Sequence, residues 1–207
     1  MNFYTVNGSP NCRKVHAVIN YLQLDVQINE LNIFTGQLDT PEFHALNPNG
    51  MVPVLEDGHF LLWESNAIMQ YLANAKGDNT FYPGDPKQRA DIHRWQCWEQ
   101  GHFNRASGNL VFENMLKCIF KIGEPDAEKV AAATGDFHKY ATVLDGHLAD
   151  KDFMLGKQLT LADFSVAGFS EYFDTAKIPF RKYPNLVAWL ERLDAIPAWA
   201  DTPSLAA

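Results

Sequence analysis

The pattern of hydrophobic and polar positions differs between the two parts of this chain. In the first part, short alternating runs predict strands over residues 2–6, 26–33, 52–55 and 59–63, the second with a phase slip that we interpret as a bulge. Helical spacing of apolar residues predicts helices over 11–22, 40–46 and 65–75. The order is βαβ, a helix, then ββα, which predicts a small mixed α/β sheet with helices on its faces.

A polar stretch rich in proline and glycine, residues 78–86, follows and predicts a linker. Beyond it every strong pattern is helical: a long helix over 92–119 with a break near Gly108, a stripe repeating at Val130, Phe137 and Leu144, and a last helix over 186–193. Thr160 and Asp163 have the spacing of a capping box. We therefore predict an α/β domain over 1–77 and an all-helical domain over 87–207.

Composition narrows the function classes. The formal net charge of −8 argues against a general nucleic-acid-binding surface. The N-terminus lacks the pattern of a signal peptide, and no apolar run is long enough for a membrane span. The 3 cysteines form no disulfide framework, and the histidines show no recognised metal spacing. We expect a cytoplasmic protein without a metal, a nucleic-acid partner or a membrane partner.

The stretch 47–65 is the most informative part of the sequence. Pro53 interrupts a strand-like run, where a proline is normally excluded because it cannot donate to a strand ladder. We interpret it as a deliberate break, with a cis bond, that leaves the backbone of Val52 free for a ligand. Glu64 and Ser65 open a helix, whose N-terminus offers unpaired N–H groups and a positive dipole end. Together these features predict a site for a peptide-like molecule with charged ends.

Ser9 and Pro10 mark the start of the first helix and allow two interpretations. Ser9 can be the N-cap and Pro10 the first helical residue. Alternatively, the Ser9 hydroxyl donates a hydrogen bond to an anion at the helix N-terminus, such as a thiolate. A hydroxyl committed to a ligand would be a poorer cap, so the two roles are expected to compete. Cys12, one turn further on, is expected to be a buried structural thiol.

The chain combines a βαβ start, Asn-Pro-x-Gly-x-Val-Pro-x-Leu at 47–55, Glu64-Ser65, and Leu-Thr-Leu-Ala-Asp-Phe at 159–164. In this combination and order it resembles the cytosolic glutathione transferases over nearly its whole length. The resemblance implies a thioredoxin-like first domain that binds glutathione as a co-substrate, with no tightly bound cofactor, and a homodimer. It implies that Ser9, in the position of the catalytic serine, stabilises the thiolate. The implied glutathione-binding residues are Gln37, Met51, Val52, Pro53, Glu64 and Ser65.

Asn11 is a second candidate for contacting sulfur, because Ser-Pro-Asn also resembles the bacterial nu class. The second domain is implied to supply a hydrophobic pocket for the electrophile, for which we name Phe34, His102, Arg105 and Phe112 as candidates.

The sequence departs from the serine-type pattern at the glycine end of glutathione. Those classes often place His or Lys where Leu38 and Asp39 stand here, and delta enzymes have a histidine at the position of Gly50. Gln37 could substitute as a neutral donor, and Asp39 is expected to cap the helix over 40–46.

Three functions remain open. They are conjugation of glutathione to hydrophobic electrophiles, a nu-type glutathione-dependent peroxidase or disulfide reductase, and non-enzymatic binding on the same fold.

Overall fold

The computed structural model describes residues 1–205. By its internal contacts the chain divides into two compact units. The first contains residues 1–82 together with the segment from Ile196 onward, and the second contains residues 83–195. The point of division falls inside the stretch expected to be the linker. The segment from Ile196, which we had assigned to the helical domain, clusters with the first unit.

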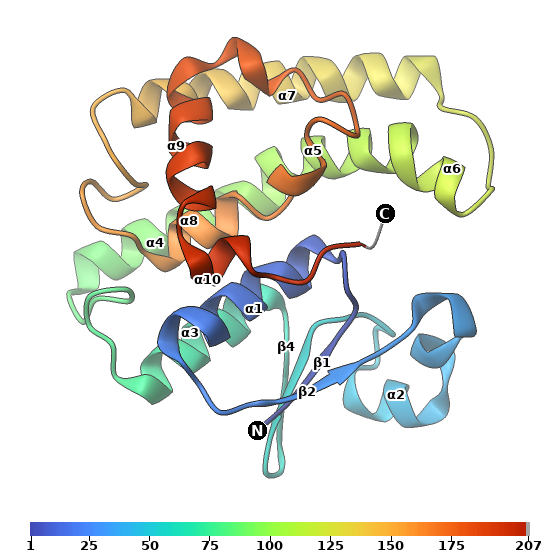
Figure 1. Ribbon diagram of the computed structural model, residues 1–207, viewed down its shortest axis with the longest axis vertical. Coiled ribbons are helices and arrows are strands. Elements are labelled where there is room, and N and C mark those ends of the chain that lie inside the picture. The colour runs from blue at the N-terminus through green and yellow to red at the C-terminus, as the bar shows by residue number, and fades with distance from the viewer. Residues whose placement is uncertain (206–207) are drawn as a thin grey trace. The chain divides into compact units, whose positions relative to one another are not determined.

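The first unit is thioredoxin-like. Its elements are β1 (Asn2–Thr5), α1 (Pro10–Leu22), β2 (Gln27–Glu30), the 3₁₀ turns η1 (Ile33–Thr35) and η2 (Gln37–Asp39), α2 (Pro41–Leu46), β3 (Val54–Asp57), β4 (Phe60–Trp63), α3 (Ser65–Lys76) and α10 (Pro197–Ala200). The sheet order is β2-β1-β3-β4, with β2 parallel to β1 and the other two pairs antiparallel. In Figure 1, α1 and α3 lie on one side of this sheet and α2 on the other.

Alternation along β1 determines which side chains face α1. Phe3 and Thr5 are fully buried and both contact His16 of α1, Phe3 edge-on at 5.0 Å between ring centroids and Thr5 through its hydroxyl at 3.1 Å. Tyr4 points to the opposite face, where its hydroxyl donates to Glu56 at 3.1 Å. The predicted apolar stripe of α1, with Val15 and Val18 among its members, is buried. The apolar face of β1, with its two-residue period, therefore packs on the apolar stripe of α1, with its 3.6-residue period, as expected.

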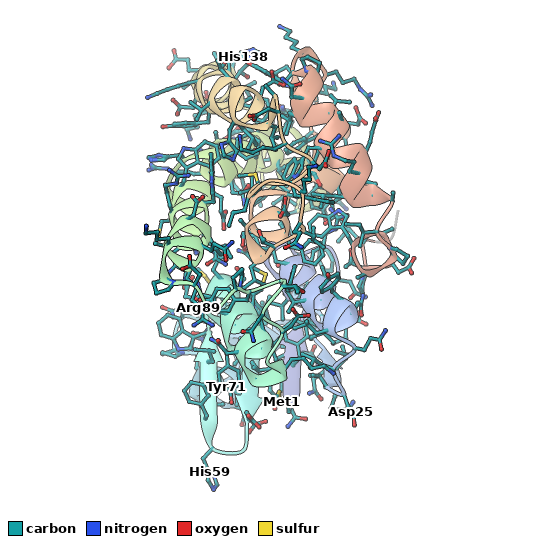
Figure 2. All side chains as sticks on the ribbon, turned by 90° about the vertical axis from the view of Figure 1, so that its left-hand side faces the viewer. Met1, Asp25, His59, Tyr71, Arg89 and His138 are labelled. Atoms are coloured by element: carbon teal, nitrogen blue, oxygen red, sulfur yellow. The ribbon has the colours of Figure 1, made fainter. Side chains whose placement is uncertain are left out.

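Two predictions in this unit were wrong. The strand predicted over 26–33 ends at Glu30, and the phase slip marks the entry to the η1 turn rather than a bulge. Asp39 does not cap α2, because it belongs to η2. The cap is Thr40, whose hydroxyl accepts from the Phe43 N–H at 3.2 Å. The hairpin predicted at Asp57-Gly58 is present, and Figure 2 shows His59 at its tip.

The second unit is helical. Its elements are α4 (Pro86–Trp98), the π-helical turn η3 (Glu99–Phe103), α5 (Asn104–Val111), the π-helical turn η4 (Phe112–Leu116), α6 (Lys117–Ile119), α7 (Ala127–Leu148), α8 (Leu161–Val166), the 3₁₀ turns η5 (Ser170–Tyr172) and η6 (Phe180–Lys182), and α9 (Pro184–Asp194). The predicted stripe of α7 is buried at Phe137 and Leu144. Within residues 1–205, no helix combines the length and the apolar composition that crossing a membrane requires.

The break predicted near Gly108 is absent, since Gly108 lies inside α5. Its missing side chain serves packing instead: a Cβ there would lie 3.2 Å from the Phe169 ring. The helical ladder is interrupted at the two π-helical turns, where the N–H of Asn104 bonds to Glu99 and that of Lys117 to Phe112. Such insertions leave no Gly or Pro signature in a sequence.

The predicted capping box at the start of α8 is confirmed, with the Thr160 N–H donating to Asp163 at 2.8 Å. Asp163 also accepts from the Met154 N–H at 2.8 Å and from the Trp189 indole at 2.9 Å. Its complete burial raises the pKa of this carboxyl to about 6. One carboxylate thus joins α8, α9 and the loop before them.

His16 makes the stability of the first unit depend on pH. Burial lowers the pKa of this ring to about 4, below the 6.5 of a free histidine. As the pH falls below 6.5, His16 is protonated in the unfolded chain but stays neutral in the folded chain. The free energy of unfolding is therefore highest above pH 6.5 and decreases as the pH falls toward 4. Between these limits we expect a loss of roughly 2 kcal/mol, reduced from the full shift to allow for screening by water.

Urea unfolding of the wild type and His16→Gln at several pH values measures this loss. The variant will be less stable throughout, but its stability should fall less steeply between pH 6.5 and 4. Asp163 titrates in the opposite sense in both proteins, so its contribution cancels in the difference. If the unfolding free energies of the two proteins fall equally steeply between pH 6.5 and 4, this pH dependence does not come from His16.

Candidate active site

The start of α1 holds Ser9 in the geometry predicted for a cap. The Ser9 hydroxyl oxygen accepts from the Cys12 N–H at 3.4 Å, and Pro10 is the first helical residue. That distance exceeds the usual 2.7–3.2 Å of such a bond, so the cap is weak. As a cap the oxygen only accepts, and a hydroxyl keeps its proton for donation. The two roles of Ser9 are therefore compatible, contrary to the competition we expected.

Cys12 behaves as the structural thiol that the sequence predicted. It is 1% exposed, and its burial raises the pKa of the thiol, although hydrogen bonds to Ser9 and Thr5 act in the opposite direction. The protonated form therefore dominates at neutral pH. This sulfur is not a nucleophile of the site.

The loop before β3 presents the backbone of Val52. The Val52–Pro53 peptide bond is cis, as predicted. Buried Asn47 holds the loop: its side-chain N–H donates to the Met51 carbonyl at 2.6 Å, and the Gly50 N–H returns to the Asn47 carbonyl at 3.0 Å. Within residues 1–205, neither the N–H nor the C=O of Val52 has a hydrogen-bond partner. An extended peptide can pair with both.

Glu64 and Ser65 open α3 in an unusual conformation. Glu64 has φ 75° and ψ 111°, a region that residues with a Cβ rarely adopt. Its exposed carboxylate does not cap its own helix. Ser65 is buried, and its hydroxyl donates to the Asn11 side-chain oxygen at 3.3 Å. The strained backbone is thus held where the first N–H groups of α3 begin.

The Ser65–Asn11 hydrogen bond brings together the N-termini of α1 and α3, which lie far apart in the sequence. Each terminus carries about half a positive charge, and among residues 1–205 the N–H groups of Asn11 in α1 and Ser65 in α3 have no hydrogen-bond partner. Asn11 is exposed, and because its oxygen accepts from Ser65, its NH₂ group faces away from that bond. The result is an electropositive patch, without a formal cation among Ser9, Asn11 and Ser65, that favours an anion.

Gln37 and the turn at Gly50 lie near the opposite end of the Val52 loop. The Gln37 side-chain oxygen accepts from the Asn32 N–H at 2.6 Å, which leaves its NH₂ group as the donor we expected. Sequence reasoning missed His44. A Cβ on Gly50 would lie 3.0 Å from Cε1 of His44, so this exposed ring stands where a residue-50 side chain would project. Only the fold reveals this, because the two positions are separated by a helix end and a turn.

The four electrophile candidates are all exposed side chains. Phe34 is 63% exposed in η1, and Phe112 is 42% exposed at the start of η4. His102 is exposed and stacks on Tyr140 at 5.0 Å, and Arg105 is exposed on α5. These four residues stay predictions. Among residues 1–205, no group of three or more His, Cys, Asp or Glu side chains could hold a metal ion.

Known proteins are similar to this chain along most of its length. The family models described as the N-terminal and C-terminal domains of glutathione S-transferase match residues 3–80 and 127–192. A glutathione S-transferase of Hyoscyamus muticus is 32% identical over 196 residues, covering 93% of this chain and 92% of that protein.

Two solved structures extend the similarity to the fold. A theta-class glutathione S-transferase of Xanthomonas axonopodis pv. citri, solved with glutathione bound, is 29% identical with a TM-score of 0.87, covering 99% of this chain and 97% of that one. A delta-class glutathione transferase of Nilaparvata lugens is 30% identical with a TM-score of 0.82, covering 94% and 88%. With a first unit that presents a free backbone beside a cis-proline and a second unit built of helices, this chain belongs to the glutathione S-transferase family.

Proposed function

We propose that this protein conjugates the thiolate of glutathione to small hydrophobic electrophiles, with Ser9 as the catalytic residue. The observation that carries the proposal is the meeting of the α1 and α3 N-termini at Asn11 and Ser65, beside the free backbone of Val52. This arrangement offers a tripeptide one place for its backbone and another for an anionic end.

Ser9 would act by stabilising charge. Glutathione has a free thiol, and such thiols have a pKa of about 8.5, so only a few per cent is nucleophilic at pH 7. A hydrogen bond to a charged group contributes about 1.5–3 kcal/mol. At about 1.4 kcal/mol per pKa unit, Ser9 would lower the thiol pKa by roughly one to two units, with help from the α1 dipole. The proton leaves to solvent.

The chemical step then needs no covalent enzyme intermediate. The thiolate sulfur attacks the electrophilic carbon, a carbon–sulfur bond forms, and the leaving group departs with its electron pair or an added double bond takes up a proton. The Val52 backbone would orient the cysteinyl part, with Pro53 and Met51 flanking it. Glu64 and Ser65 would hold the γ-glutamyl group. Glu64 would pair with its ammonium, and Ser65, whose hydroxyl proton is donated to Asn11, would donate its backbone N–H to the carboxylate.

We propose that the side chain of His44 binds the glycine carboxylate of glutathione. The resemblance to delta enzymes puts a histidine at the position of Gly50, and the ring of His44 reaches that place from α2. Its Nδ1 lies 3.3 Å from the Pro48 carbonyl, which leaves Nε2 for a ligand. Gln37 would add its neutral NH₂ group from the same side.

A second candidate function is glutathione-dependent reduction of hydroperoxides or disulfides, with Asn11 contacting sulfur. It is favoured by the exposed NH₂ group of Asn11 beside the Ser65 hydroxyl. We further propose that the protein acts as a cytoplasmic homodimer, as is typical of the family, and that Phe34, His102, Arg105 and Phe112 contact the electrophile.

Ser9→Ala should lower kcat/KM for conjugation of a halogenated nitroarene by about tenfold to a hundredfold, the value of one hydrogen bond to a charged group. The pH profile of kcat/KM should also move to higher pH, because the thiol loses its stabilising donor. Ser9→Thr, which keeps a hydroxyl, is the control. Unchanged kinetics in Ser9→Ala would remove Ser9 from its role.

The same assays separate the two functions. Asn11→Ala should reduce conjugation, because it removes the acceptor of the Ser65 hydrogen bond, and it should reduce hydroperoxide turnover to a larger extent only if the second function holds.

His44→Ala should weaken glutathione binding by about fivefold, near the most that an exposed ion pair contributes. The control is a modified ligand, glutathione with its glycine carboxylate converted to an amide. This ligand should bind the wild type and His44→Ala equally well. Calorimetric titration measures all four affinities. An equal loss for both ligands would show that His44 supports the loop and does not meet the carboxylate.

Glu64→Gly should raise the unfolding free energy by about 1 kcal/mol, because glycine relieves the strain at φ 75° and offsets only part of that gain through its flexible unfolded state. Glu64→Ala keeps the strain, so it should not be stabilised. Both variants should bind glutathione less tightly, since both lose the carboxylate. Equal stability of the two variants, measured by urea unfolding, would contradict the strain.

A further inference from the structure

The C-terminal segment, residues 196–205, lies against the helix that carries Ser9. Figure 1 shows α10 and the chain after it beside α1. Trp199 of α10 is fully buried, and the Asn20 side chain of α1 donates to the Ala198 carbonyl at 3.3 Å. Although it ends the sequence, this segment belongs to the same compact unit as Ser9.

Arg13 is the main link between the two elements. Its guanidinium carbon lies 3.9 Å from the centroid of the Trp199 ring, a stacked cation–π contact. Its Nε donates to the Thr202 hydroxyl oxygen at 3.0 Å, and that hydroxyl donates in turn to the Trp199 carbonyl at 2.8 Å. Arg13 is 7% exposed, so this contact is shielded from water. The Arg13 N–H also bonds to the Ser9 carbonyl at 2.9 Å.

The segment then reaches the turn before Ser9. Ser9 closes a turn with Val6, its N–H lying 3.2 Å from the Val6 carbonyl, and Gly8 in this turn has φ 78°. A Cβ added to Gly8 would lie 2.6 Å from the Cβ of Leu205. The Leu205 side chain therefore rests on the backbone of Gly8, in space that any other residue there would fill. Leu205 itself is only half-buried.

We propose that the C-terminal segment positions Ser9. Leu205 packs on the Gly8–Ser9 turn and restrains it. Arg13, which stacks on Trp199 and donates to Thr202, fixes the first turn of α1. The proposal rests on the proposed role of Ser9. Leu205, Arg13 and Thr202 are positioning residues, because they act through Ser9 and need not touch glutathione. Since the cap at Ser9 is weak, with its 3.4 Å bond, an outside restraint on the hydroxyl has a clear purpose.

The restraint should influence the thiolate more than the binding of glutathione. Val52, Glu64 and Ser65, which would bind the peptide, belong to the β3 loop and to α3, and the segment contacts neither through Leu205 or Thr202 in the interactions above. Releasing Leu205 would therefore loosen the Ser9 hydroxyl while leaving most of the peptide contacts in place. Loss of alignment on the scale of about 1 Å can cost up to about a hundredfold in rate.

Leu205→Ala tests the proposal with little risk to folding, because the side chain is half-exposed. We expect kcat for conjugation to fall by about tenfold, within the range that misplacement allows, with KM for glutathione changed less than about twofold. The pH profile of kcat/KM should move to higher pH, as in Ser9→Ala. Leu24→Ala is the matched control: it truncates another half-exposed leucine of the same unit, just beyond the opposite end of α1.

Thr202 provides a second, independent variant pair. Thr202→Val removes the oxygen that accepts from Arg13 at nearly constant volume, and should reproduce the effect of Leu205→Ala. Thr202→Ser keeps the oxygen and should restore wild-type kinetics. If Thr202→Val and Thr202→Ser behave alike, the Arg13 link does not position Ser9.

Amide hydrogen exchange of a peptide covering residues 7–13 measures the restraint directly and does not depend on the role of Ser9. Faster exchange there in Leu205→Ala, but not in Leu24→Ala, supports the proposal, and unchanged exchange overturns it. A fall in kcat matched by an equal rise in KM also overturns it, because the segment would then support binding. If Ser9→Ala leaves the pH profile unchanged, the proposed role of Ser9 fails, and the exchange data alone still decide whether the segment restrains the turn.

Discussion

The site depends on one contact between two helix starts, the hydrogen bond from the Ser65 hydroxyl to Asn11. It links the first turn of α1 to the first turn of α3 and so combines two partial positive charges in one patch. The rest of the first unit supports this contact. Phe3 and Thr5 seat α1 on the sheet through His16, and the β3–β4 hairpin delivers the chain to Glu64. If either helix turned about its axis, the patch would separate into two weaker ones.

A patch of this kind suits the activation of a thiol better than a fixed cation would. A nearby lysine or arginine would pair with the thiolate and lower its pKa further, but it would also hold the sulfur back from the electrophile. Hydroxyl and amide donors stabilise the charge more gently, by about 1.5–3 kcal/mol for a hydrogen bond to a charged group. Such a shift brings the thiol pKa close to neutral pH, where the thiolate is abundant and still nucleophilic.

Several features of both units could be predicted because local and global signals agree there. The cis-proline, the opening of α3 at Ser65 and the cap of α8 each follow from residues within a few positions of one another. What could not be predicted depends on contacts across the fold. His44 takes the place of a side chain at Gly50, and Leu205 packs on Gly8, through proximities that no sequence spacing encodes. The π-helical turns were missed because they change the helix period without a breaker residue.

The overall charge explains why local dipoles must do the binding. The chain carries a formal net charge of −8, and glutathione is itself an anion at neutral pH, so the long-range field does not attract it. At physiological ionic strength charges are screened beyond about 8 Å, which confines the repulsion to the last approach. Within that distance, the donors that we propose for glutathione are the helix N-termini, the Val52 N–H and the side chains of Asn11 and His44. The acidic Glu64 would face the ligand's ammonium. Affinity and thiolate stabilisation are therefore properties of this short-range arrangement, and the thiolate stabilisation depends on the position of the first turn of α1.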